Sequence, residues 1–156
     1  LGGNVAPNRK AGLQSAGCTF ELTPTGRSLF GGAREAARTL QYYHNDVVVE
    51  LPPCATSLGT SAANSAHAAA VWPAARSGEA AGGAPTMITF QAHPEFSTPT
   101  GTKVLQRILR GEAGKRGEPW LRERLATTSD DATAATAPQM TAAATALLSP
   151  KALNYM

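Results

Sequence analysis

The large apolar side chains that build a protein core are few in this sequence, and most of them lie in two segments. Of its 156 residues, 30 are Ala, whereas Leu, Val, Phe and Ile together number only 26. The two dense segments are residues 18–51 and 87–109, and the intervening residues 55–86 are mostly Ala, Ser, Gly and Thr. We therefore expect one core that is assembled from the two segments, and the length favours a single domain.

The composition argues against several protein classes. No stretch approaches the ~18 consecutive apolar residues of a membrane span, and no repeat with a period of about 20–50 residues occurs. Two Cys cannot make a disulfide framework. The formal net charge is only +3, and the basic residues 103–124 lack a nucleic-acid-binding motif. We therefore expect neither a membrane nor a nucleic acid as partner, and no specific protein partner can be inferred.

Three short segments have the pattern of β-strands. Residues Cys18 to Leu22 alternate between apolar and polar types, and a Thr-Pro pair ends the run. Val47 to Val49 form a β-branched run that is closed by Leu-Pro-Pro. Met87 to Phe90 form an apolar run that is consistent with a buried strand.

A helix is expected to follow the third of these strands. Ser97 or Thr98 can cap it, and Gly111 is a natural residue to end it. Its apolar face would consist of Val104, Leu105, Ile108 and Leu109. A buried strand that leads through a polar turn into a helix is typical of α/β architecture. Residues 115–125 predict a second, short amphipathic helix, and residues 138–148 could form an Ala-rich helix with few anchors.

The polar turn after residue 90 carries the clearest candidate chemistry, because His93 and Glu95 are separated by one proline. Proline fixes its own φ and favours an extended residue before it, so the turn can direct the imidazole outward and hold the carboxylate close to it. In open α/β sheets, functional groups lie at the carboxyl ends of strands. On spacing alone, a surface turn without function fits the pattern as well.

Five segments in the same order resemble the motifs of class I glutamine amidotransferases. Phe90 to Phe96 (FQAHPEF) is similar to the triad motif in which an apolar strand precedes Gln, a small residue, His, Pro and Glu. The other similar segments are Leu1–Val5 with Asn8, Phe20–Phe30, His44–Val48 and Leu51–Pro53. The stand-alone amidotransferase-like proteins and γ-glutamyl peptidases are the types that fit best.

The resemblance implies a three-layer, flavodoxin-like α/β fold that is truncated at its N-terminus. Residues 1–126 would be the C-terminal portion of the amidotransferase domain, with a low-complexity insertion at 64–85. Residues 127–156 would be an Ala/Thr-rich tail, with the candidate helix at its end. In the family, the nucleophilic Cys lies in a Gly-x-Cys-x-Gly turn shortly before the Leu-Gly-Gly segment, so we expect that turn upstream of Leu1.

The resemblance also implies an activity, namely hydrolysis of the side-chain amide of glutamine or of a γ-glutamyl amide. His93 would be the general base and acid, and Glu95 would orient it. Tyr43, His44 and Asp46 would flank the pocket of this small-molecule substrate. The family needs no metal or organic cofactor, and it supports a cytosolic location.

The same residues also allow other interpretations. Cys18 and Cys54 lack the setting of a reactive thiol, so neither is expected to be the nucleophile. The histidines and acids at 44, 46, 67, 93 and 95 lack metal-motif spacing, and His67 would be incidental. The segment around His44 also fits a purely structural turn. The alternative for the whole chain is a non-catalytic fragment or pseudoenzyme that acts, if at all, as a binding or structural module.

Overall fold

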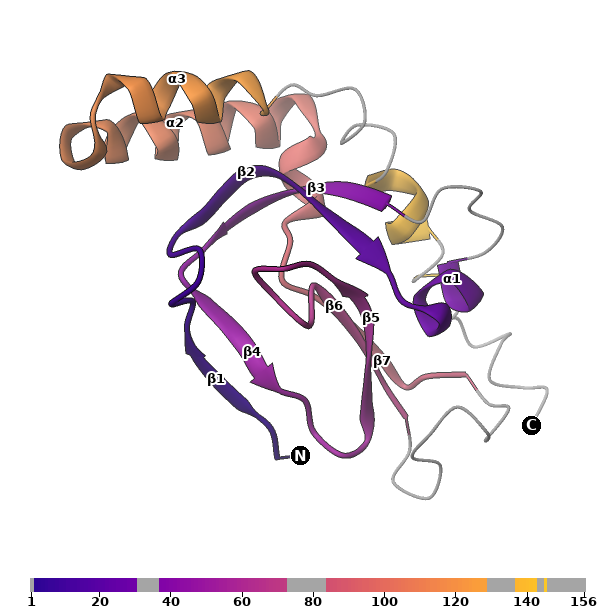
Figure 1. Ribbon diagram of the computed structural model, residues 1–156. Coiled ribbons are helices and arrows are strands. Elements are labelled where there is room, and N and C mark those ends of the chain that lie inside the picture. Colours follow the sequence, from indigo (N-terminus) through magenta and orange to yellow (C-terminus); the bar gives the residue numbers. More distant parts are fainter. Residues whose placement is uncertain (1, 31–36, 73–83, 129–136, 143–144, 146–156) are drawn as a thin grey trace.

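The computed structural model describes residues 2–30, 37–72, 84–128, 137–142 and 145 of the chain (Figure 1). Within these residues, the strands are β1 (Asn4–Pro7), β2 (Gln14–Leu22), β3 (Ala37–His44), β4 (Asp46–Glu50), β5 (Ala55–Thr60), β6 (Ala68–Val71) and β7 (Met87–Phe90). The helices are α1 (Pro24–Phe30), α2 (Pro99–Arg116) and α3 (Glu118–Ala126), together with the 3₁₀ turn η3 (Pro94–Ser97).

The described strands form two sheets. A small sheet pairs β1 with β4, and a five-stranded sheet has the order β3-β2-β5-β6-β7. Each of these pairings is antiparallel. The larger sheet curls, and the α2–α3 hairpin lies at one end of it, next to the long β2–β3 hairpin (Figure 1). The chain after β7 turns back to β3, and this turn brings η3 and α2 against the far end of the sheet.

The three predicted strands are confirmed as parts of β2, β4 and β7. The burial expected for β7 is wrong, because Met87 is 47% exposed and the strand alternates between exposed and half-buried residues. The reason is its place in the sheet. Among the described strands, β7 has a partner only on its β6 side.

The predicted helix after Thr98 is confirmed, but its end is not at Gly111. Helix α2 continues to Arg116 and is capped by Gly117, whose φ of 88° falls in the region that favours glycine. A glycine inside a helix costs only about 1 kcal/mol relative to alanine. The buried side chains of Leu105 and Leu109 offset this cost, since each contributes roughly 2 kcal/mol. The second predicted helix is α3.

The small-residue segment predicted as an insertion, 64–85, contributes an internal strand of the sheet. Residues Ala68 to Ala70 of β6 are buried between β5 and β7. Ala68 and Ala70 form a buried cluster with Leu58 of β5. Their small side chains leave room for the rings of Phe30, Phe90 and Trp72, which pack against this cluster. Residues 73–83 of the predicted insertion lie outside the described residues.

Part of the predicted tail also contacts the core. Residues 137–142 and 145 are helical, and Ala137 and Met140 are buried among residues of the sheet. We call this cluster the sheet core, and it consists of Phe20, Leu22, Leu40, Tyr42, Ala92, Ala137 and Met140. The predicted helix over 138–148 is thus seen in part, and residues 143–144 and 146–148 lie outside the described residues.

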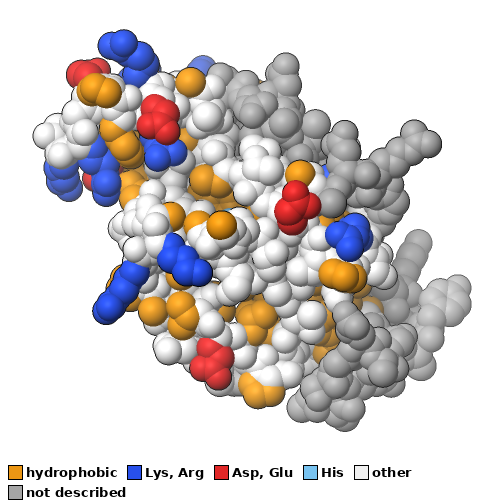
Figure 2. All heavy atoms as spheres, viewed as in Figure 1, with side chains coloured by type: hydrophobic (Ala, Val, Ile, Leu, Met, Phe, Trp, Pro, Cys, Tyr) orange, Lys and Arg blue, Asp and Glu red, His pale blue; other side chains and the backbone are white. Residues whose placement is uncertain are grey.

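The α2–α3 hairpin carries most of the exposed positive charge that the structure describes, and Figure 2 shows Lys and Arg side chains in this region. Beneath it lies a second cluster, the helix core, which consists of Ala16, Leu105, Leu109 and Leu121. Near the helix ends, Glu112 pairs with Lys115 at 3.5 Å and with Arg116 at 3.4 Å. No helix among the described residues combines the length and the hydropathy that a membrane crossing requires.

Candidate active site

The turn after β7 brings an imidazole and a carboxylate together on the surface. His93 Nδ1 and Glu95 Oε1 lie 2.8 Å apart, which is hydrogen-bond distance. The two side chains are 39% and 65% exposed. Such an exposed pair contributes little to stability, about 0–1 kcal/mol. Its geometry nevertheless matches the orienting pair of a nucleophile–base–carboxylate site, because the Nδ1 contact leaves Nε2 available to a reacting group.

Local chemistry explains why the turn adopts this shape. His93 has φ −114° and ψ 82°, outside the helical region that the following proline disfavours. Its imidazole stacks on the ring of Phe96 at a centroid distance of 4.7 Å. Thr98 closes the turn, because its hydroxyl donates to the Glu95 carbonyl at 2.8 Å and accepts from the Gly101 amide at 3.0 Å. The same threonine thus ends η3 and caps α2.

His44 is brought toward this pair. Burial lowers the pKa of its imidazole, and the nearby charge of His93 lowers that pKa further, against opposing effects from Asp46. Its Nδ1 lies 2.8 Å from the Asp46 carbonyl oxygen, which can only accept, so Nδ1 carries a proton. Nε2 of His44 is buried and has no hydrogen-bond partner among the described residues. The neutral ring therefore presents an unused acceptor near His93.

Tyr43 and Asp46, the other two residues predicted to bind substrate, have surroundings unlike those of His44. Tyr43 packs against the helix core, on the side of β3 that faces α2 and α3. Asp46 is exposed. Its backbone carbonyl accepts hydrogen bonds from His44 Nδ1 at 2.8 Å and from Gln91 Nε2 at 3.2 Å. Adjacent residues of a strand point to opposite faces, so Tyr43 lies toward the helix core whereas the His44 ring lies by that of Tyr42, at a centroid distance of 5.5 Å.

Sequence reasoning missed a buried polar group behind the turn. His67 is 1% exposed, with Nδ1 2.8 Å from the Tyr42 hydroxyl and Nε2 2.8 Å from Ser61 Oγ. Burial lowers the pKa of His67 to about 4, and the charge of His44 acts in the same direction. Burial also raises the pKa of Tyr42. Both rings therefore stay neutral near pH 7. The only sequence signal was a lone histidine in an Ala/Ser run.

Acidification is expected to destabilise the fold through His67. The unfolded chain binds a proton there below about pH 6.5, whereas the folded chain does so only near pH 4. Stability is therefore lost as pH falls through this window, by about 2–3 kcal/mol between roughly pH 7 and pH 4.5. Urea unfolding at both pH values measures the loss. The variant H67Q should lose less, although His44 retains a contribution of the same sign. An equal loss in H67Q would contradict the assignment to His67.

Neither thiol lies at the turn. Cys18 packs against the sheet core, and burial raises its pKa in spite of the opposing charge of Arg124. The Cys54 carbonyl accepts from the Trp72 amide at 2.9 Å, so Cys54 lies at the end of β6. That end of β6 pairs with the beginning of β7, through Val71 and Met87. His93 follows the opposite end of β7.

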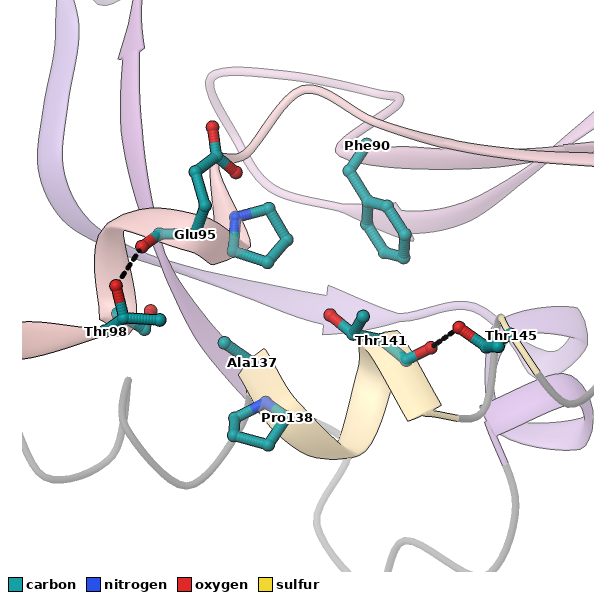
Figure 3. Close-up of a pocket in the computed structure, with 9 residues that line it drawn as sticks. Phe90, Glu95, Thr98, Ala137, Pro138, Thr141 and Thr145 are labelled. Atoms are coloured by element: carbon teal, nitrogen blue, oxygen red, sulfur yellow. Dashed lines mark hydrogen bonds between the residues drawn. The ribbon is translucent and has the colours of Figure 1, made fainter. Parts of the chain in front are cut away.

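A cavity of about 590 Å³ opens beside Glu95. Figure 3 shows Phe90 and Glu95 on one side of it, facing Ala137, Pro138 and Thr141 across the opening. Its lining is mostly apolar, so it suits the aliphatic part of a ligand better than a charged group. Within the described residues, no group of three or more His, Cys, Asp or Glu side chains is arranged to hold a metal ion.

Comparison with known proteins identifies the fold. No family model and no curated protein sequence matches the chain. The crystal structure of a glutamine amidotransferase from Thermotoga maritima matches with a TM-score of 0.66 and 15% identity, over 94% of this chain and 55% of that chain. The crystal structure of SMU.1228c matches with a TM-score of 0.58 and 17% identity, over 91% of this chain and 56% of that one. The chain thus spans about half the length of both.

At such low identity, these likenesses show the fold alone. The mixed α/β arrangement with its curled sheet is that of flavodoxin-like, class I amidotransferase-type structures, which confirms the predicted fold class. Activity and substrate are separate questions, because the same fold can carry different sites.

Proposed function

We propose that the chain supplies the base and the orienting carboxylate of a Cys-His-Glu site that hydrolyses the side-chain amide of glutamine or a γ-glutamyl amide. The observation that carries the proposal is the 2.8 Å contact between His93 Nδ1 and Glu95 Oε1 on an exposed turn. A paired imidazole with a free Nε2 is the arrangement that proton transfer to and from a nucleophile requires. The amidotransferase-type fold supports the same proposal.

The proposed reaction needs a thiol that this chain does not place at His93. Following the family resemblance, we assign it to a cysteine N-terminal to Leu1 in a longer protein. His93 Nε2 accepts the thiol proton, and the thiolate attacks the amide carbon. The C–N bond breaks as His93 returns the proton to the departing amine, which leaves a thioester. His93 then deprotonates a water molecule, which attacks the thioester. The C–S bond breaks, glutamate is released, and His93 returns the proton to the thiolate.

The proposed substrate is a small molecule with a γ-glutamyl group. Among Tyr43, His44 and Asp46, the best supported contact is with His44, since its buried Nε2 is an acceptor without a partner among the described residues. Free glutamine and γ-glutamyl peptides share the acyl group, so both fit the proposal. The chemistry requires only protein groups and water. A cytosolic location is part of the proposal and rests on the family resemblance.

Covalent labelling tests this proposal directly. A longer protein that includes the sequence upstream of Leu1 is treated with a glutamine-mimicking electrophile, and peptide mass spectrometry locates the adduct. We expect one adduct on an upstream Cys, none on Cys18 or Cys54, and no glutamine hydrolysis by the 156-residue chain alone. Hydrolysis by that chain that survives C18S and C54S would defeat the proposal. An upstream sequence without Cys would favour a non-catalytic fragment.

A further inference from the structure

Two backbone hydrogen bonds hold the turn that carries His93. The Gln91 amide donates to the His67 carbonyl at 2.9 Å, and the His93 amide donates to the Gln41 carbonyl at 2.7 Å. Between them, Ala92 is buried in the sheet core. The turn is therefore anchored to β3 at one point and to the residue before β6 at another. Its shape depends on the distance between the two acceptors, the Gln41 and His67 carbonyl oxygens.

Side chains fix that distance. Gln41 is followed by Tyr42, which is fully buried and whose hydroxyl lies 2.8 Å from His67 Nδ1. On the other side of the imidazole, Nε2 lies 2.8 Å from Ser61 Oγ. The Phe20 ring stacks on His67 at 5.0 Å with an interplanar angle of 15°. The Tyr42 ring meets it edge-on at 5.3 Å and 84°. His67 is thus held by two polar contacts and two ring contacts.

The polar contacts decide the position of the ring, because a buried donor or acceptor that loses its partner costs more than the contact itself contributes. Tyr42 lies in β3 and His67 directly precedes β6, and these two strands are not neighbours in the sheet, so the contact links distant parts of it. Ring packing alone would tolerate small rotations, whereas the pair of hydrogen bonds does not.

We propose that His67 is a positioning residue for His93, and that its contacts with Tyr42 and Ser61 hold the two carbonyls that fix the turn. His67 does not touch a reacting group. Its side chain links β3 to the residue whose carbonyl anchors Gln91, and the turn then presents the His93 imidazole to Glu95. The importance of this positioning for catalysis rests on the proposed function.

Nuclear magnetic resonance on the 156-residue chain tests the proposal. The chain has three histidines, so ¹⁵N-histidine spectra are simple to assign by single substitution. The variant Y42F removes one hydroxyl from the contact. We expect amide exchange at Gln91 and His93 to become about tenfold faster than in the β2–β3 hairpin of the same sample. We also expect the His93 Nδ1 signal to lose the signature of its hydrogen bond to Glu95.

Two variants serve as controls. Y43F removes the hydroxyl of the neighbouring tyrosine, which packs on the opposite side of β3, and should leave both readouts unchanged. H67Q retains one donor and one acceptor, so the Gln91 and His93 amides should stay nearly as protected from exchange as in the wild type. H67L is similar in volume but has no polar group, so these amides should exchange faster. A global loss of stability would accelerate exchange throughout the sheet, and only a positioning role predicts an effect confined to the turn and to the His93 signal.

The proposal is overturned if Y42F leaves the two amides and the His93 signal as they are in the wild type, or if all amides change together. If H67L does not fold, Y42F decides alone, since it is the smaller change. These outcomes do not depend on catalysis. A failure of the proposed function would appear instead as missing labelling of an upstream Cys, with the nuclear magnetic resonance result intact.

Discussion

Replacing His93 by alanine is expected to lower the rate of amide hydrolysis about 100- to 10,000-fold in the longer protein that carries the nucleophile. In the proposed reaction the imidazole accepts the thiol proton, donates a proton to the departing amine and later deprotonates the water that hydrolyses the thioester. Alanine can do none of these. The measurement is the initial rate of ammonia release from glutamine, together with the yield of thioester trapped by a glutamine-mimicking electrophile.

The control must separate lost chemistry from lost folding. His93 is 39% exposed and its pairing with Glu95 contributes little to stability, so the variant should unfold at nearly the wild-type urea concentration. E118Q changes an exposed carboxylate on α3 and should retain full activity. E95Q should lose less than H93A, because the amide oxygen can still accept from Nδ1. Unchanged labelling and hydrolysis in H93A would remove His93 from the mechanism.

Features that depend on neighbouring residues could be predicted from the sequence. The alternation in Cys18 to Leu22 and the run from Met87 to Phe90 identified strands, and Thr98 identified the beginning of a helix. The proximity of His93 to Glu95 follows from the proline between them, because a tight turn allows few separations between its ends. In each case, the information lies within about ten residues of chain.

Features that depend on strand order could not be predicted. β6 consists of three alanines and one valine, which carry no pattern that distinguishes a central strand from a loop. The Tyr42–His67 contact requires knowing that β3 and the residue before β6 face the same buried space. Likewise, which of Tyr43 and His44 faces the helix core is set by the pairing of β3 with β2, and a shift of one residue would reverse it.

The contact between η3 and α2 leads to the second large expected effect, in the variant G101A. Gly101 lies in the first turn of α2, where a Cβ atom would overlap the Glu95 carbonyl group and lie 2.8 Å from the Phe96 Cα. Alanine would favour the helix by about 1 kcal/mol. Overpacking typically costs about 1–3 kcal/mol, and a clash with backbone atoms that cannot rotate away belongs at or above the upper end of this range. A cost of about 3 kcal/mol less the gain of about 1 kcal/mol gives an expected net loss of about 2 kcal/mol.

Gly111, in the same helix, provides the control for G101A. No atom lies within 4 Å of a Cβ built at Gly111, so G111A should raise the free energy of unfolding by about 0.5–1 kcal/mol. Urea unfolding of the two variants should give opposite signs. Relief of the overlap in G101A would also move η3 away from α2 and carry Glu95 with it, which should weaken the His93 Nδ1 contact in ¹⁵N spectra. If G101A were as stable as G111A, the close packing of η3 on α2, and with it the fixed position of Glu95, would be contradicted.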